Sequence, residues 1–253
     1  MSLTFYSYNL VDYANITADS ENSLFPVSNL KDDRRTKTFR SIATTANITF
    51  DMLTTEPIDS FYIVDHPKLG FGFSDLTLEG NATSNFSSPA FSTTISVNHT
   101  HGVGFKEFVS QSYRFWRLTV TGASFVDVSK VFLGSKVAPS TYGINFNWNF
   151  YDDDLSKSKT NRLGQKFTDV IGSKKKLNFS FETLNPTELA ELMTIIDYNR
   201  VSRPLFIRIG DESDTIIDDE DRLGGYYYLD KIPKLVNKSF ALWDLSFRLS
   251  EGL

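Results

Sequence analysis

The sequence contains no cysteine, only three histidines and no long apolar run. The lack of cysteine excludes disulfide cross-links, cysteine-ligated metals and a thiol nucleophile, and it suits a protein that folds in a reducing cytosol. No stretch approaches the roughly 20 apolar residues that cross a bilayer, and the first residues lack the basic and apolar regions of a secretory signal. We therefore expect neither membrane insertion nor a secretory leader.

The chain also lacks a strong excess of one charge. Its net charge is −5, so no overall field attracts nucleic acid or an anionic membrane, and we expect no nucleic-acid binding specificity. Charged residues make up 23% of the chain and apolar residues 40%, which are ordinary values for a globular protein. At 253 residues, the chain is long enough for two domains, each with a full core.

Aromatic residues, by contrast, are abundant at 14% of the chain, as in β-proteins that fill their sandwiches with rings. The clearest strand is 113–122, in which Trp116, Leu118 and Val120 alternate with polar residues before the turn at Gly122. Other short strands, separated by turn signals, lie roughly 8–12 residues apart before it. This pattern predicts a β-sandwich or jelly roll.

The histidines offer one candidate metal site. His99 and His101 share one face of an extended segment, and His66 is the one histidine left to join them. Since a metal site needs at least three protein ligands, two histidines on one strand do not define one. We therefore predict no metal and no cofactor.

Six segments occur in a suggestive order over residues 24–134. They are Pro26-Val27-Ser28-Asn29-Leu30, Thr38-Phe39-Arg40-Ser41, the strands 48–51, 58–64 and 113–122, and Val131-Phe132-Leu133-Gly134. Their order and spacing resemble the discoidin-like (galactose-binding-like) jelly roll. The resemblance implies loops at one end of the sandwich that bind glycans or lipid headgroups, although the paired cysteines of many extracellular members are missing here.

A basic run at 31–41 lies between apolar segments. One interpretation is a rim that binds an anionic sugar, a phosphate or a partner subunit. The other is a solvated loop whose arginines pair with neighbouring aspartates or backbone carbonyls. With three phenylalanines as stacking faces, its arginines complete a candidate carbohydrate-binding set. The set consists of Arg34, Arg35, Arg40, Phe71, Phe73 and Phe105.

The second half begins after residue 138 and contains one clear helix. Asn185 is a good N-cap, Pro186 suits the first helical position, and Glu188 completes a capping box. Apolar residues then recur at the helical period, so we predict a helix over about 186–199 that packs on a sheet. The stripe consists of Leu189, Leu192, Met193 and Ile196. Strands are expected at 144–150, 177–181, 205–209, 225–229 and 239–249, and the acidic run 152–154 is expected to be a turn.

Several features of this half form a second pattern. They are the alternating strand that ends Asn147-Trp148-Asn149-Phe150, a basic turn, the strand, capped helix and strand up to residue 209, and the terminal Ser246-Phe247-Arg248-Leu249. Together they are similar to the tube-type domain of bacteriophage tail and baseplate proteins, including distal tail proteins. The predicted fold is mainly β, with a discoidin-like jelly roll over 1–138 and a tube-like β-sandwich with one packed helix over 139–253.

These resemblances imply a structural virion protein of the tail tip or baseplate. Such a protein is made in the host cytoplasm and forms a homo-oligomeric ring, a trimer or hexamer, around the tail channel. Its partners are the tail tube, hub and tape measure proteins. The jelly roll then points outward, where it contacts a host glycan or braces neighbouring tail proteins. We expect the ring interface to be set by charge. The candidate interface residues are Lys157, Lys159, Lys174, Lys175, Lys176, Asp218, Asp219 and Asp221.

Two other functions compete with this reading. The first is a carbohydrate-binding adhesion module without a ring-forming role. The second is an enzyme such as a glycosidase, which needs two carboxylates at a defined separation in a cleft. Although the segment 211–221 is rich in acids, nothing apolar is positioned to raise the pKa of one of them. We therefore predict an acidic surface loop there and no enzymatic activity.

Overall fold

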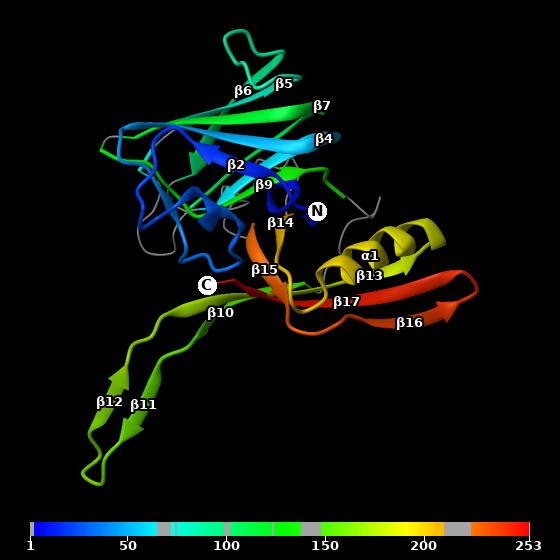
Figure 1. Cartoon of the computed structure of the whole chain (residues 1–253). Coiled ribbons are helices and arrows are strands. Elements are labelled where there is room, and N and C mark those ends of the chain that lie inside the picture. The colour runs from blue at the N-terminus through cyan, green and yellow to red at the C-terminus, as the bar shows by residue number, and fades with distance from the viewer. Residues whose placement is uncertain are drawn as a thin grey trace.

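The computed structural model describes residues 3–64, 72–73, 75–98, 102–122, 124–137, 148–209 and 224–252. Over these residues the chain is mainly β, with two large antiparallel sheets and one α-helix. One sheet belongs to the first half of the chain and the other mainly to the second half, from which a thin arm projects (Figure 1). The predicted fold class is confirmed. No helix among these residues is long and apolar enough to cross a membrane.

Two long strands organise the first sheet. β4 (Thr45–Val64) and β7 (Val103–Thr121) pair antiparallel along most of their length, and the pairing register shifts between Asp51 and Glu56. Such an irregularity bends a strand without ending it. The two strands that we predicted on either side of Pro57 are therefore two segments of one strand, β4.

The other elements of the first half surround this pair. They are η1 (Leu10–Asp12), β2 (Asn15–Ala18), η2 (Val27–Lys31), β3 (Phe39–Arg40), β5 (Asp75–Asn81), β6 (Phe91–Asn98), β8 (Asp127–Val128) and β9 (Lys130–Gly134). The large sheet has the order β2-β4-β7-β5-β6 with β9 beside β4, and β3 pairs separately with β8. Trp116, Leu118 and Val120 are fully buried in its core, as the alternation in β7 predicts.

The second sheet has the order β1-β14-β15-β17-β13-β10, with β16 beside β17. Its elements are β1 (Leu3–Tyr6), β10 (Asn149–Asp154), β13 (Ser173–Leu184), α1 (Pro186–Asn199), β14 (Leu205–Ile209), β15 (Gly225–Leu229), β16 (Lys234–Ser239) and β17 (Leu242–Glu251). Between β10 and β13, β11 (Lys157–Thr160) and β12 (Lys166–Asp169) form a separate two-stranded ribbon. The part of the expected strand 144–150 before residue 148 lies outside the described residues.

The helix occupies the predicted range and has the predicted cap. The Asn185 side chain accepts hydrogen bonds from the backbone N–H groups of Thr187 and Glu188 at 2.9 and 3.0 Å. The Glu188 carboxylate in turn accepts from the Asn185 N–H at 3.1 Å. Leu192 and Ile196 are buried against the sheet, where they join the same core as Phe179 and Phe247. The capping box and the apolar stripe thus fix where the helix begins and which face it buries.

β1 is the exception to the division of the chain into halves. It pairs antiparallel with β14, and Phe5 exchanges two backbone hydrogen bonds with Val137. The Phe5 ring is fully buried, with its centroid 5.6 Å from that of Phe247. The predicted first domain, 1–138, contained this strand, whereas the structure places it in the sheet of the second half. Burial of both faces of β1 explains this location, since the second core would otherwise lose Leu3 and Phe5.

Where the two halves meet, rings from both form a cluster that we name the seam. Its buried members are Tyr6, Tyr62, Val64, Val103, Phe132, Phe206 and Tyr226. The Phe206 ring lies at centroid distances of 5.4 Å from Tyr62 and 5.6 Å from Phe132. Polar contacts accompany the rings: Arg35 forms an ion pair with Glu251 at 2.6 Å, and the Tyr6 hydroxyl donates to Glu107 at 2.9 Å. The seam joins the two halves into one body.

We predict that Phe206→Ala lowers the free energy of unfolding by about 3–5 kcal/mol, because it leaves a cavity among buried rings. Phe240→Ala is the matched control, since Phe240 is 99% exposed at the turn between β16 and β17. Its cost should stay within about 0.5 kcal/mol. Urea denaturation of both variants measures the difference, and equal costs would show that the seam does not stabilise the fold.

Candidate functional site

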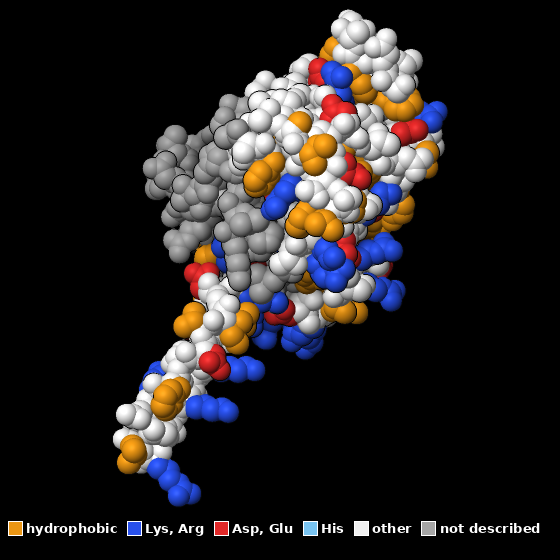
Figure 2. Space-filling model, turned by 60° about the vertical axis from the view of Figure 1, so that its left-hand side comes forward, with side chains coloured by type: hydrophobic (Ala, Val, Ile, Leu, Met, Phe, Trp, Pro, Cys, Tyr) orange, Lys and Arg blue, Asp and Glu red, His pale blue; other side chains and the backbone are white. Residues whose placement is uncertain are grey.

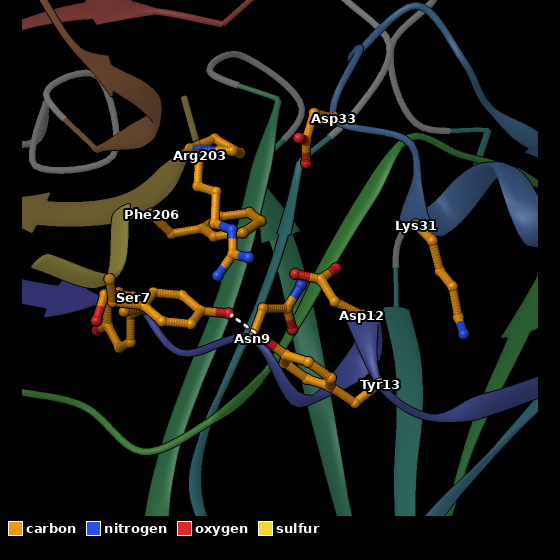
Figure 3. A pocket seen from close by; sticks show the side chains of 11 residues that line it. Ser7, Asn9, Asp12, Tyr13, Lys31, Asp33, Arg203 and Phe206 are labelled. Atoms are coloured by element: carbon orange, nitrogen blue, oxygen red, sulfur yellow. Dashed lines mark hydrogen bonds between the residues drawn. The ribbon is translucent and has the colours of Figure 1, made fainter. Parts of the chain in front are cut away.

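A polar pocket of about 220 Å³ lies beside the seam (Figure 3). Its lining residues are Tyr6, Ser7, Asn9, Asp12, Tyr13, Lys31, Asp33, Tyr198, Arg203, Pro204 and Phe206, which come from both halves. In the close view, the Arg203 guanidinium and the Asp12 carboxylate extend into the space between the halves, whereas Lys31 points away from them. A ligand in this pocket would therefore contact both halves at once.

Asn9 positions the first-half wall of the pocket. Its side-chain oxygen accepts hydrogen bonds from the N–H groups of Val11 and Leu133, and its amide donates to the Val131 carbonyl. These bonds cap η1 and attach it to β9, so Asp12 and the following Tyr13 hold fixed positions. The Tyr13 hydroxyl lies 3.1 Å from the Tyr198 hydroxyl on α1, which closes one side of the pocket.

The carboxylates of the pocket lack direct partners. Among the described residues, Asp12, Asp33 and Arg203 make no side-chain hydrogen bond or ion pair, although the Arg203 guanidinium lies 4.8 Å from the centre of the Tyr198 ring. Asp12 is an exposed residue, but partial burial of its carboxyl raises its pKa to about 6, and the neighbouring Asp33 carboxylate acts in the same direction. Burial also raises the pKa of Asp33. The pocket thus offers two carboxylates as hydrogen-bond acceptors and the Arg203 guanidinium as a donor.

Lys130 lies behind this wall and is 3% exposed. Its ammonium group donates to the backbone carbonyls of Asn29 and Asp32. Burial lowers the pKa of Lys130 to about 8, while the negative charges of Asp32 and Asp33 oppose that shift. Lys130 thereby fixes the loop after η2 that carries Asp33 into the pocket.

The pocket has the donors and acceptors of a binding site. The described residues contain no group of three histidine, cysteine or acidic side chains that could hold a metal ion. His66, His99 and His101 lie outside the described residues, as does the acidic segment 211–221. The arrangement can hold a small polar ligand by hydrogen bonds, and we assign it no reaction.

The predicted carbohydrate-binding arginines are engaged within the fold. Arg34 makes a bidentate ion pair with Asp32, as the solvated-loop interpretation of this run expects. Arg35 is buried and pairs with Glu251 across the seam. The Arg40 guanidinium contacts Asp127 at 2.6 Å and lies 4.5 and 4.6 Å from the ring centres of two phenylalanines, 25 and 125. Arg35 and Arg40 therefore hold elements together, and only Arg34 projects into solvent.

The predicted stacking faces are also separated. Phe73 is 3% exposed and belongs to the core of the first half, so it has no free ring face. Phe105 is half-buried, since one face contacts the Tyr62 ring and the Arg208 guanidinium lies 4.2 Å from its centre. Phe71 lies outside the described residues. The structure does not bring the described members of the set together in one open groove.

A second candidate surface is the arm, which we define as residues 155–171. It consists of the β11–β12 ribbon and projects away from both halves (Figure 1). Apolar side chains are exposed along it, and basic side chains surround them (Figure 2). The exposed apolar residues are Leu163 at 86%, Phe167 at 61%, Val170 at 84% and Ile171 at 55%. An isolated two-stranded hairpin is only marginally stable in water, so a covered position suits this arm better.

The predicted interface residues fall into three groups. Lys157 and Lys159 lie on the exposed β11 strand of the arm. The basic run 174–176 lies instead on β13, where Lys175 and Lys174 are opposite Asp152 and Asp153 of β10, and Lys176 pairs with Asp153 at 2.9 Å. The expected turn at 152–154 is therefore wrong: these residues end strand β10, and lysines lie across from the first two acids. Asp218, Asp219 and Asp221 lie outside the described residues.

Sequence reasoning missed the pocket and underrated the arm. The pocket residues come from segments almost 200 residues apart, such as Asp12 and Arg203, so no local motif joins them. The arm did leave a local signal in Asn161-Arg162-Leu163-Gly164, a turn between two polar, lysine-rich segments. In the structure the Asn161 side chain accepts from the N–H groups of Leu163 and Gln165 at 2.9 Å, and Gly164 has a φ of +79°.

Comparison with known proteins gives similarities in structure only. No protein-family model and no curated protein matches the chain. Solved structures with a similar fold include the module CpGH89CBM32-5 from Clostridium perfringens, in complex with GalNAc-β-1,3-galactose, at 13% identity and a TM-score of 0.44. The comparison covers 51% of this chain and 100% of that one.

Two other bacterial modules give similar values. For the fucose-binding module SpX-3 from Streptococcus pneumoniae, the identity is 9% and the TM-score 0.44, with 51% of this chain and 98% of that one covered. For the family 32 carbohydrate-binding module of C. perfringens NanJ, in complex with galactose, the values are 12% and 0.43, with 53% and 99% covered. Each comparison spans about half of this chain.

We predict that Lys130 makes stability rise with pH between about 8 and 9.5. Because the pKa of Lys130 is about 8 in the folded state and about 10.4 in an unfolded chain, the folded state loses its proton first. The penalty for burying the charge therefore disappears as pH rises through this window. Lys130→Met should lack this slope, so that wild type gains about 1.5 kcal/mol relative to the variant across the window.

The measurement is urea denaturation at several pH values, with Lys157→Met on the exposed arm as the control. Tyrosine ionisation affects all three proteins alike and cancels in the difference. Parallel pH profiles for wild type and Lys130→Met would contradict the prediction.

Proposed function

We propose that this protein is a structural subunit of a multi-copy assembly, and specifically a ring-forming component of the tail tip of a tailed bacteriophage. In this proposal the second half joins copies around a central channel, and the first half faces outward. Its site of action is the virion, and its neighbours are tail tube, hub and tape measure proteins. The observation that carries the proposal is the exposed arm, whose apolar side chains need a partner surface.

The edges of the second sheet support the same proposal. Among the described residues, β10 ends the sheet on one side, and β16 pairs on one side only, with β17. Both β10 and β17 run antiparallel to β13, whereas β16 runs antiparallel to β17. β10 and β16 therefore run in opposite directions within one copy. A rotation about an axis parallel to the strands keeps these directions, so in such a ring β10 of one copy can continue the ladder antiparallel to β16 of the next.

Native mass spectrometry of the whole chain tests the proposal, with electron microscopy of the same sample. We expect a discrete trimer or hexamer with a central channel. In a matched variant, Asn-Gly replaces residues 156–171. This short turn suits the position, because the Leu155 N–H already donates to the Gly172 carbonyl at 2.9 Å.

This arm-less variant should remain folded but lose the ring. A wild-type chain that stays monomeric at all concentrations and binds no tail component would overturn the proposal. Open filaments would contradict the closed ring while leaving self-association intact.

Glycan binding is a second candidate function, and the pocket beside the seam favours it. A polyhydroxylated ligand forms hydrogen bonds with the groups that line this pocket: two carboxylates, a guanidinium and the hydroxyls of Tyr13 and Tyr198. In this reading a sugar ring lies between Asp12 and Arg203. We expect a glycan array to show binding that Asp12→Asn weakens, whereas Arg34→Gln on the exposed loop leaves it unchanged. An array without signal, or equal binding by the Asp12→Asn variant, would exclude this function for the pocket.

A further inference from the structure

We propose that the tip of the arm of one copy docks into an apolar groove beside α1 of a second copy. The groove has a volume of about 520 Å³ and a mostly apolar wall. At roughly 30 Å³ per water molecule, that volume corresponds to about 17 water molecules. This inference rests on the proposed function, since it names the surface that receives the arm within the assembly.

The groove lies between α1 and the first half. Its apolar wall is formed by Tyr8, Leu10, Pro57, Val137, Ile195 and Tyr198. Glu56 and Glu191 also line it, and the described lining contains no basic residue. The groove therefore suits an apolar side chain that is accompanied by positive charge.

The tip of the arm has this composition. Leu163 is 86% exposed in the turn and Phe167 is 61% exposed on β12. Arg162 and Lys166 stand directly beside them in the sequence. Apolar burial in the groove, with the basic groups at its acidic margin, would cover the side chains that the free arm leaves in water.

The charges of the whole chain point to another copy as the partner. The arm carries four basic residues and one acidic residue, a net charge of +3. Since the whole chain carries −5, the remainder carries −8, and the arm of one copy is attracted to the body of another. The arm does not dock into the groove of its own copy, because it projects from the β10 side of the second sheet, away from α1 (Figure 1).

The arm is long enough to reach a neighbour. About nine residues separate Asp154, the last residue paired in the second sheet, from the tip at Leu163. At about 3.3 Å per residue, the tip therefore stands roughly 30 Å beyond the sheet. A tip at that distance contacts the next body in a ring while the sheets themselves join through their edges.

Cysteine cross-linking tests the docking directly, because the chain has no cysteine of its own. Leu163→Cys places a thiol at the tip, and Thr194→Cys places one on the α1 side of the groove. On mild oxidation, the double variant should give covalent multimers on a denaturing gel, whereas each single variant should not. A control pair, Leu163→Cys with Val109→Cys on the exposed surface of β7, should give none.

Substitutions supply an independent readout. Leu163→Asp should weaken self-association at least about tenfold, whereas Val109→Asp should leave it unchanged. Lys166→Glu and Glu191→Lys should each weaken it, and the two together should restore it. If rings form but the cross-link and the charge exchange both fail, the arm docks elsewhere and the inference is overturned while the proposed function stands. If no oligomer forms at all, the proposed function fails first.

Discussion

The packing of Phe206 against Tyr62 and Phe132 is the contact on which the rest of the structure depends. Each half has its own core, so each sheet is stabilised internally. The seam fixes how the two sheets are oriented, and aromatic pairs of this kind contribute about 0.5–1.5 kcal/mol each beyond their buried area. Since the polar pocket and the apolar groove both have walls from the two halves, their shapes exist only while the seam is intact.

The elements that could be predicted were those with local causes. The helix follows from a cap, a proline and an apolar stripe within 14 residues, and strands 205–209 and 225–229 follow from short apolar runs. The seam could not be predicted, because Tyr62 and Phe206 are about 140 residues apart and each suits an ordinary strand. The strand at Asp152 was missed for a similar reason: its neutralising lysines lie about 20 residues later.

The candidate sites show the same limit in side-chain chemistry. Arginine and phenylalanine are suitable for glycan binding, but the same properties suit them to buried ion pairs and cores. Arg35 and Arg40 pair with Glu251 and Asp127, partners that lie 216 and 87 residues away. The residue types therefore identify side chains that are able to bind a sugar. Whether they are available for it depends on partners that lie far away in the sequence. The positive charge of the arm could be predicted, because its lysines are visible in the sequence. That the arm projects into solvent could not be predicted from the sequence.

The position of β1 has a consequence for how the protein is made. Leu3 pairs with Ile209, so β1 joins a partner that the ribosome makes about 200 residues later. At about 5–20 residues per second, Leu3 and Phe5 wait roughly 10–40 s before their sheet can close. The first half can fold in that interval, but the second sheet cannot be completed until β14 is made. Closure of the second sheet therefore joins β1 to strands that are made much later, and a chaperone that covers this apolar strand would prevent its premature pairing.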